Sequence, residues 1–347
     1  MTRKLTPFRR AYRWFVHLLV AGRRPARGRL LHGLLLGSIC MILLAAVTAN
    51  AILVRAGNTL SAGDGVSTHM AAPPGSAPAS LAAPMGAWTK VYDAPGVSWR
   101  NLYFVSASTG YAVGGPDYGV EGPGVVVKTT DGGQNWTQLP VAANGWMSGF
   151  GCKNPTTCWV AGRFGQVFRT TDSGASWQQA NTAVYGGYLY SVEWTGVGNT
   201  IMVGATCNES ASFLRAEDGW NFSIVNVDAC FVQWEISCPG AGLCYSTGKA
   251  FYKSTDNGRN WPRVASTGGV QYYSIDCTST SACWTVGRYG NIRVTRDGGN
   301  SWQSQSGAAS TSTLIRVRML DATHGYAVGD PGAIYRTDDG QTWTAFS

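Results

Sequence analysis

The nine residues KTTDGGQNW (128–136) decide the fold, because related copies of them recur along the chain. The copies are RTTDSGASW (169–177), the altered LRAEDGWNF (214–222), KSTDNGRNW (253–261), VTRDGGNSW (294–302) and YRTDDGQTW (335–343). The acidic residue at the fourth position returns every 39 to 45 residues. A period near 40 residues, with turn residues at a fixed phase, is typical of β-propeller blades.

Each copy has the chemistry of a tight turn. The acidic side chain can accept hydrogen bonds from backbone N–H groups inside the turn. The glycine two residues later supplies a backbone conformation that other residues resist, and the tryptophan begins the next strand and packs its ring beneath the turn. We therefore interpret the aligned acidic residues as structural clips and not as ligands: Asp131, Asp172, Glu217, Asp256, Asp297 and Asp338.

A second pattern lies upstream of each turn and completes the repeat. Its copies are GYAVG (110–114), CWVAG (158–162), the looser TIMVG (200–204), CYSTG (244–248), CWTVG (283–287) and GYAVG (325–329). Strands alternating with turns give four strands per unit. The predicted fold class is all-β, a single β-propeller of six four-stranded blades over residues 88–347. Seven blades is the alternative, because residues 88–91 resemble the strand after such a turn and could help to close the propeller.

The N-terminal quarter, residues 1–87, is not part of this domain. Residues 1–55 hold ten Lys or Arg and no acid, whereas residues 88–347 hold 17 basic and 18 acidic side chains, so the basic pI does not indicate a nucleic-acid partner. Residues 1–29 are predicted to be a cytoplasmic basic segment, and the uncharged residues 30–54 a transmembrane anchor. A signal peptide cleaved after Ala49-Asn50-Ala51 is the alternative. Residues 55–87 read as a flexible Ala/Pro/Gly/Ser linker.

Both interpretations place the propeller on the extracytoplasmic side, either anchored to the membrane or secreted. The cysteines agree with export, because three pairs have five residues between them at the mouth of a predicted hairpin. These pairs are Cys152 with Cys158, Cys238 with Cys244 and Cys277 with Cys283, and we also expect Cys207 to pair with Cys230. No metal site or cofactor is predicted, since the propeller has a single histidine, His324, and no CxxC motif.

The turns match the Asp-box, S/T-x-D-x-G-x-x-W, which sialidases, xyloglucanases and sorting receptors also carry. The pairing of the YAVG strand with the Asp-box resembles the photosystem II stability and assembly factor family over about residues 88–347. That family consists of exported or lumenal propellers that bind membrane-protein intermediates. The resemblance implies a protein-binding scaffold or assembly factor, with a membrane protein or surface complex as its partner. The cysteine pairs depart from the plant and cyanobacterial pattern.

The irregular residues after the YAVG-type glycines are the candidate binding face, because these loops open on the face with the central pocket. Arg163-Phe164-Gly165 and Arg288-Tyr289-Gly290 repeat one unit three blades apart. Arginines suit carboxylates or an acidic protein segment; the alternative is that they are solvated or bridge blades. The full candidate set is Arg163, Phe164, Lys249, Arg288, Tyr289, Asp330, Arg100, Arg316, Asp117 and Tyr118, of which Arg100 and Arg316 are further arginines that a sialidase-like site would need.

Catalytic motifs do not support an enzyme. The chain has no nucleophile elbow, phosphate-binding loop or dinucleotide fingerprint. It also lacks the R-I-P arginine motif of sialidases, and xyloglucanase-like enzymes resemble tandem propellers with two facing carboxylates. We therefore predict a non-catalytic scaffold; a sialidase-like or other glycoside hydrolase, or a carbohydrate-binding surface protein with a glycan or small-molecule ligand, is the alternative.

Overall fold

In the computed structural model, the described residues are 92 and 94–345, apart from 118, 183, 185, 206–212, 226, 228–231, 267, 306, 308–310 and 331. The apolar run 30–54 and the segment 88–91 therefore lie outside the described residues. Within the described part, no helix is long and apolar enough to cross a membrane.

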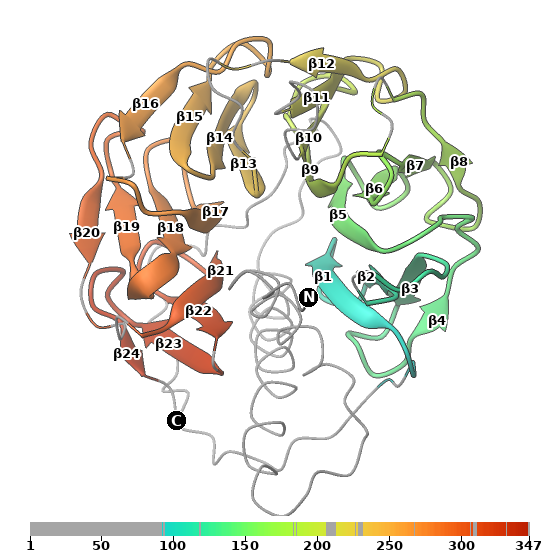
Figure 1. Cartoon of the computed structure of the whole chain (residues 1–347), viewed down its shortest axis with the longest axis horizontal. Helices are drawn as coiled ribbons and strands as arrows, with labels where there is room; N and C mark the ends of the chain where they lie inside the picture. The colour runs from blue at the N-terminus through green and yellow to red at the C-terminus, as the bar shows by residue number, and fades with distance from the viewer. Residues whose placement is uncertain are drawn as a thin grey trace, which may run out of the picture.

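The described strands form six antiparallel four-stranded sheets arranged around an axis (Figure 1). Blades 1 to 3 are β1 (Ser98–Phe104), β2 (Gly110–Gly115), β3 (Val125–Thr129), β4 (Thr137–Gln138); β5 (Met147–Cys152), β6 (Cys158–Gly162), β7 (Val167–Thr170), β8 (Gln178–Gln179); β9 (Leu189–Trp194), β10 (Ile201–Ala205), β11 (Phe213–Ala216), β12 (Ser223–Val225). Blades 4 to 6 are β13 (Glu235–Gly240), β14 (Leu243–Thr247), β15 (Ala250–Ser254), β16 (Arg263–Ser266); β17 (Tyr272–Cys277), β18 (Cys283–Gly287), β19 (Ile292–Thr295), β20 (Gln303–Gln305); β21 (Thr313–Met319), β22 (Gly325–Asp330), β23 (Ala333–Thr337), β24 (Thr344–Ala345). A single 3-10 turn, η1 (Arg288–Gly290), follows β18.

The predicted all-β propeller of six four-stranded blades is confirmed. In each blade the first strand is innermost and successive strands pair outward in chain order. The inner strands contact one another in the order β1, β5, β9, β13, β17 and β21. Figure 1 shows an opening between blade 6 and blade 1, and no strand of a seventh blade lies among the described residues.

Apolar side chains fill the spaces between consecutive blades. Between blades 2 and 3, for example, Trp159 and Val167 pack against Leu189, Val203 and Leu214, all fully buried. Fully burying an aliphatic side chain of this kind stabilises a fold by roughly 1.5–3 kcal/mol. The strands alternate in direction and each faces a neighbouring blade on both sides, which explains why the repeat is rich in Val, Ile and aromatic residues.

Three hairpin disulfides are confirmed. The Cα atoms are 4.0 Å apart in Cys152–Cys158, 4.1 Å in Cys238–Cys244 and 4.0 Å in Cys277–Cys283. Each bond joins the end of an inner strand to the start of the second strand of the same blade. Cys207 and Cys230 lie outside the described residues, so their pairing stays a prediction.

The Asp-box turns fasten each blade to the one before it. In blade 1, Asp131 accepts the backbone N–H of Asn135 at 2.9 Å, which closes the turn. In blade 2, the carbonyl of Ser173, inside the turn, accepts hydrogen bonds from Tyr111 at 3.3 Å and from Lys128 at 2.9 Å, both of blade 1. Trp284 and Arg296 of blade 5 reach the turn of blade 6 in the same way. These turns therefore connect neighbouring blades, which is a structural role.

Two of the six predicted clip residues are wrong. In blade 6 the turn N–H groups of Gln341 and Thr342 donate to Asp339, at 2.7 Å each, and not to Asp338. In blade 3 the equivalent acceptor is Asp218, to which the N–H groups of Trp220 and Asn221 donate, and not Glu217.

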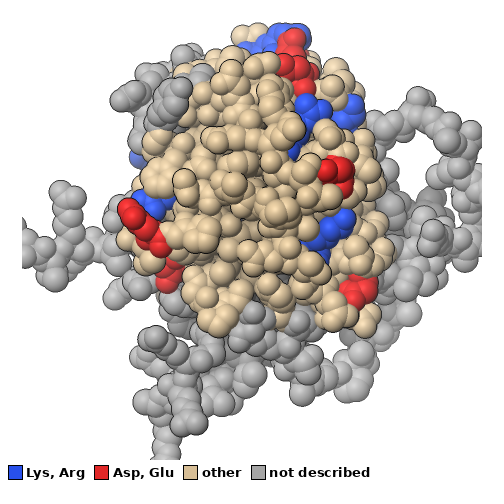
Figure 2. Space-filling view, turned by 90° about the vertical axis from the view of Figure 1, so that its right-hand side faces the viewer, with Lys and Arg blue, Asp and Glu red and all other residues tan. Residues whose placement is uncertain are grey.

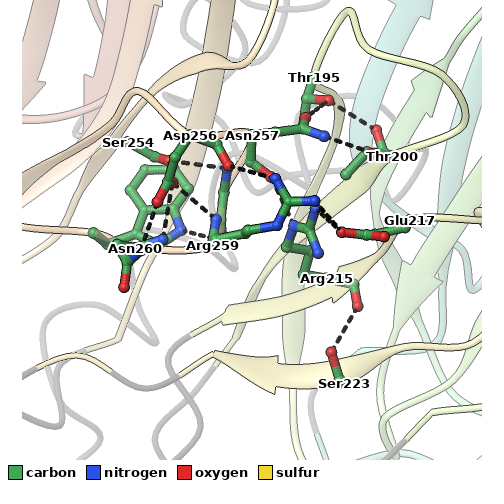
Figure 3. A network of polar contacts seen from close by, with 12 residues as sticks. Thr195, Thr200, Arg215, Glu217, Ser223, Ser254, Asp256, Asn257, Arg259 and Asn260 are labelled. Carbon is green, nitrogen blue, oxygen red and sulfur yellow. Dashed lines mark hydrogen bonds and ion pairs between the residues drawn. The ribbon is translucent and has the colours of Figure 1, made fainter.

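The turns of blades 3 and 6 are one residue shorter than the regular turns, which explains both corrections. Asp339 is four residues before Trp343, and Asp218 four before Phe222, whereas Asp131 is five before Trp136. In blade 6, Thr337 ends β23 and its hydroxyl donates to Asp339 at 3.0 Å, as the hydroxyl of Thr129 donates to Asp131 at 2.8 Å. Glu217 and Asp338 lie before the shifted turns and form ion pairs with Arg215 and Arg336. Figure 3 shows Glu217 also receiving Arg259 of blade 4, at 2.6 Å, so this acid bridges two blades.

Candidate functional site

The candidate loops and the starts of the inner strands meet on one face of the propeller, which we call the mouth. The strand registers show this directly, because Ser98 pairs with Gly115 in blade 1 and Met147 with Gly162 in blade 2. The residue after each YAVG-type glycine therefore lies beside the first residues of the inner strand of its own blade. A ligand at the mouth would contact both.

A recurrent bulge shapes this end of the inner strands. In five inner strands the register slips by one residue near the start, between positions 99 and 101, 147 and 149, 189 and 191, 272 and 274, and 314 and 316. The residues that the strand register skips are Arg100, Ser148, Tyr190, Tyr273 and Ile315. A β-bulge redirects a side chain away from the regular pleat and is frequent next to binding sites.

Aromatic rings follow one another along the mouth from blade 2 to blade 5. The ring of Trp146 stacks on Tyr188 with centroids 5.4 Å apart, Tyr190 lies 4.5 Å from Trp234, and Trp234 lies 5.7 Å from Tyr273. Trp146 is also stacked with Tyr190 at 6.2 Å. We call these five residues the aromatic arc.

Arginines close the arc at both ends. The guanidinium of Arg100 lies 4.5 Å above the Trp146 ring, and Arg288 Nε donates to the Tyr273 hydroxyl at 2.9 Å. The buried indole N–H of Trp146 has no hydrogen-bond partner among the described residues. Aromatic and arginine side chains in this arrangement can stack on a ligand and donate to its carbonyl or carboxylate oxygens.

The two Arg-aromatic-Gly units present exposed rings in a strained backbone. Phe164 has φ +63° and Tyr289 φ +60°, which is rare for bulky residues, and their side chains are 43% and 64% exposed. Arg163 N–H donates to the Trp146 carbonyl at 2.9 Å, and Arg288 N–H to the Gln271 carbonyl at 3.0 Å, so both turns are held rigidly. Blades 2 and 5, which carry them, lie on opposite sides of the propeller (Figure 1).

The remaining candidate residues differ in their surroundings. Lys249 is exposed just after β14, and Asp330 ends β22 half-buried. Asp117 accepts a hydrogen bond from the Ser98 hydroxyl. Arg100 is buried and donates to the Pro116 carbonyl at 3.3 Å. Tyr118 lies outside the described residues.

Arg316 does not belong to the mouth loops. It lies inside the propeller, where its guanidinium Nη1 is 2.6 Å from Glu235 Oε1. Below this pair, Arg318 Nη1 lies 3.1 Å from Asp276 Oδ1, and Asp276 also accepts the N–H of Met319 at 2.7 Å. Sequence patterns did not suggest this internal charge network.

Glu193 and Tyr103 complete the internal network. Burial raises the pKa of Glu193 to about 8, although the nearby Arg318 and a backbone hydrogen bond from Cys238 act in the opposite direction. Burial, together with the charge of Glu193, raises the pKa of Tyr103 to about 12.

The outer rim offers no comparable site on the side seen in Figure 2. That view shows the right-hand side of Figure 1, where most of the surface is uncharged and the charged side chains lie in small scattered groups of both signs. The outer strands there carry the exposed residues Thr137, Gln138, Gln178 and Gln179. The aromatic arc and its arginines thus make the mouth the chemically distinctive face.

Comparisons with known proteins agree with this architecture. A solved structure of YCF48 bound to a D1 peptide is 17% identical, with a TM-score of 0.55, and the match covers 72% of this chain and 81% of that one. YCF48 from Cyanidioschyzon merolae is 16% identical, with a TM-score of 0.54 and coverage of 70% and 80%. At these identities the likeness shows the fold.

An enzyme shares the fold as well. The GH74 enzyme of Niastella koreensis is 18% identical, with a TM-score of 0.58, and the match covers 72% of this chain but only 46% of that one. A comparison with curated proteins finds no matching sequence. The model of the family described as photosynthesis system II assembly factor YCF48 matches residues 100–338, and the chain therefore belongs to that family.

Proposed function

We propose that this chain is a non-catalytic scaffold that binds a polypeptide segment of a membrane protein or surface complex at its mouth and assists the assembly of that complex. The observation that carries the proposal is the aromatic arc, which spans four blades and ends in Arg100 and Arg288. Tyrosine, tryptophan and arginine dominate the energetics of protein interfaces.

Family membership supports this choice of partner. One similar protein, YCF48, has been solved with a D1 peptide bound. In the present chain, a bound segment could stack on the half-buried rings of Tyr190 and Trp234. The strained turns at Phe164 and Tyr289 would hold the exposed rings in place before binding, which reduces the entropy lost on association.

We also propose that the propeller works outside the cytoplasm, tethered through residues 30–54 by the linker 55–87. The three disulfides support this, because such bonds persist mainly in oxidising compartments. The basic residues 1–29 support a cytoplasmic N-terminus. A tether raises the local concentration of the mouth at the membrane surface, so even a weak contact with a membrane-protein segment would be populated.

A glycan-binding or glycoside hydrolase function is the second candidate, favoured by the fold shared with the GH74 enzyme. The internal carboxylates of Glu235 and Asp276 do not suit catalysis, since each is held by an arginine and by a backbone N–H. Hydrolysis of xyloglucan or a sialoside by the purified chain, with loss of activity in Asp276→Asn, would establish the enzyme and contradict the scaffold.

The test is co-purification of the full chain from solubilised membranes. We expect a membrane protein to copurify with the wild type, and to be lost with the double variant Tyr190→Ala, Trp234→Ala. The matched control is Ile224→Ala, which removes an exposed side chain from the outer strand β12. Equal recovery of the same partner by both variants would contradict binding at the mouth, provided that thermal unfolding shows both to be folded.

A further inference from the structure

Five of the six boundaries between blades are built alike. At each of them the second strand of one blade lies against the inner strand of the next: β2 against β5, β6 against β9, β10 against β13, β14 against β17 and β18 against β21. Among the described strands, neither β22 nor β21 makes a comparable contact with β1. We call this boundary between blade 6 and blade 1 the seam; it is the opening visible in Figure 1.

At these five boundaries, each blade shares its apolar core with an aromatic ring of the next blade. Phe213 of blade 3 stacks on Trp261 of blade 4 with centroids 4.2 Å apart, and Phe251 of blade 4 stacks on Trp302 of blade 5 at 4.6 Å. Both phenylalanines lie in the third strand, two residues before a basic residue, and both tryptophans end an Asp-box turn. The equivalent pairs, each within one apolar cluster, are Val126 with Trp177, Val167 with Phe222 and Ile292 with Trp343.

Ile334 in β23 is the residue of blade 6 that corresponds to these positions. It stands two residues before Arg336, the basic residue of its third strand. Ile334 is buried and points to the seam, because its neighbour Tyr335 packs with blade 5 and side chains alternate along a strand. The ring of blade 1, Trp136, packs with its own blade, and the described residues of its cluster include none of blade 6. Ile334 therefore receives no ring from blade 1.

The hydrogen bonds that join other blades also have no counterpart at the seam within the described part of the chain. In blades 1 to 4 a basic residue of the third strand donates to a carbonyl in the next Asp-box turn, at 2.7–3.4 Å: Lys128 to Ser173, Arg169 to Asp218, Arg215 to Asn257 and Lys253 to Gly298. Arg336 holds the same place, three residues before the clip residue Asp339, but pairs with Asp338 of its own blade. Blade 6 thus has the residues of a blade boundary without blade 1 against them.

The chain that leads into blade 1 runs over the seam side of that blade. The ring of Tyr92 lies edge-on to Trp99 with centroids 5.8 Å apart, in the same apolar cluster as Val125. This cluster is on the face turned away from blade 2, because the next residue in the strand, Val126, packs with blade 2. Residues 88–91 directly precede Tyr92 and span at most about 14 Å, so they cannot lie far from the seam.

The sequence of this segment is that of a strand after an Asp-box turn. WTKV (88–91) corresponds to WTQL (136–139) at an offset of 48 residues, and the same offset aligns the bulge at Arg100 with the bulge at Ser148. The connection from Trp88 to β1 therefore has the length of a regular connection between blades. Such a connection starts at a ring that packs on the preceding blade, as Trp261 does on Phe213.

We propose that residues 88–91 of this chain occupy the seam, with the indole of Trp88 packed on Ile334 of blade 6. From there the chain passes to Tyr92 on the seam side of blade 1, so the segment fastens the two ends of the propeller to each other. Removal of the indole and of Ile334 from water drives the contact. The linker 55–87 then joins the propeller at the seam. This inference concerns the fold and is independent of the ligand that the mouth binds.

The test is photo-crosslinking within the full chain. A photoreactive phenylalanine analogue at position 88 should form an intramolecular adduct with the tryptic peptide 319–336, which contains Ile334. The same analogue at position 138, on the exposed outer strand β4, is the matched control and should form none with that peptide. An adduct of position 88 with a second copy or with another protein, or no adduct, would overturn the proposal. So would an adduct of position 136 with the peptide 319–336, since blade 1 would then meet blade 6 directly.

A double-mutant cycle tests the same contact through stability. Trp88→Ala and Ile334→Ala should each lower the thermal midpoint by several degrees, and the double variant by less than the sum, because both changes remove one contact. Ile334→Val is the milder variant if Ile334→Ala does not fold. Thr89→Ala, at the place of the exposed Thr137, should leave the midpoint unchanged. Additive shifts, or no shift for Trp88→Ala, would show that the two side chains do not meet, whatever the mouth binds.

Discussion

Glu235 in β13 and Arg316 in β21 are 81 residues apart, yet the carboxylate Oε1 and the guanidinium Nη1 lie 2.6 Å from each other. The other carboxylate oxygen, Oε2, accepts the backbone N–H of Ile275 at 3.1 Å. Inner strands of neighbouring blades do not pair as a sheet, so their N–H groups must find other acceptors. Glu235 therefore connects blades 4, 5 and 6 at once.

Breaking this pair should destabilise the propeller. Arg316→Met leaves the three-quarters-buried carboxylate of Glu235 without its cation and should lower the free energy of unfolding by about 1–3 kcal/mol. Glu235→Gln keeps an acceptor for Ile275 but removes the charge. Urea unfolding of both variants and of the double variant measures the coupling, and strictly additive losses would mean that the two side chains do not interact.

The turn of blade 6 contains two adjacent aspartates, Asp338 and Asp339, whose contributions to stability can be compared. Hydrogen bonds from the N–H groups of Thr342 and Gln341 lower the pKa of Asp339 to about 2, whereas Asp338 only pairs with Arg336. Asp339→Ala should therefore lower the thermal midpoint more than Asp338→Ala. A larger decrease of the thermal midpoint in Asp338→Ala would instead support Asp338 as the residue that closes the turn, as the repeat alone predicted.

The hairpin disulfides should each contribute to stability. Cys277→Ala with Cys283→Ala opens a loop with a sequence separation of 6, for which loop-closure entropy predicts a loss of about 2 kcal/mol. Guanidinium unfolding of the variant and of the wild type gives the difference. An unchanged midpoint in the wild type after full reduction would show that the bonds do not stabilise the fold.

Glu193 should make stability depend on pH. Its pKa is about 8 in the folded chain against 4.5 for the ordinary side chain, so between these values the folded state holds a proton that the unfolded state has lost. Stability from this group is therefore complete below pH 4.5 and decreases as the pH rises toward 8. Glu193→Gln should flatten the dependence of the urea midpoint between pH 5 and 8.5, and a wild-type profile that Glu193→Gln leaves unchanged would contradict the shift.

The sequence predicts the repeating parts of this protein well. Turn residues at a fixed phase, such as Asp131 with Trp136, define the blades, and equal cysteine spacing locates the three hairpin bonds. Position in a motif is a poorer guide where a turn changes length. The turn of blade 6 is one residue shorter than the regular turns, so an alignment without gaps points to Asp338, whereas the turn N–H groups donate to Asp339.

The mouth could be predicted only in part. The loops after the YAVG-type glycines were visible as irregular positions in a regular repeat. The aromatic arc was not, because a bulge determines where Tyr190 and Tyr273 point, and no residue type marks a bulge. The available signal was an aromatic residue just before or within the start of four inner strands, as in Trp146 and Trp234.

Site-specific photo-crosslinking in cells tests most directly whether the mouth binds a membrane-protein segment. A photoreactive phenylalanine analogue would replace Phe164 and Tyr289, the exposed rings of the mouth, and Ile224 on the outer strand β12, which is 39% exposed. We predict covalent adducts with the same membrane protein from positions 164 and 289 and none from position 224. Adducts from position 224 alone, or no adduct from either mouth position, would contradict the account.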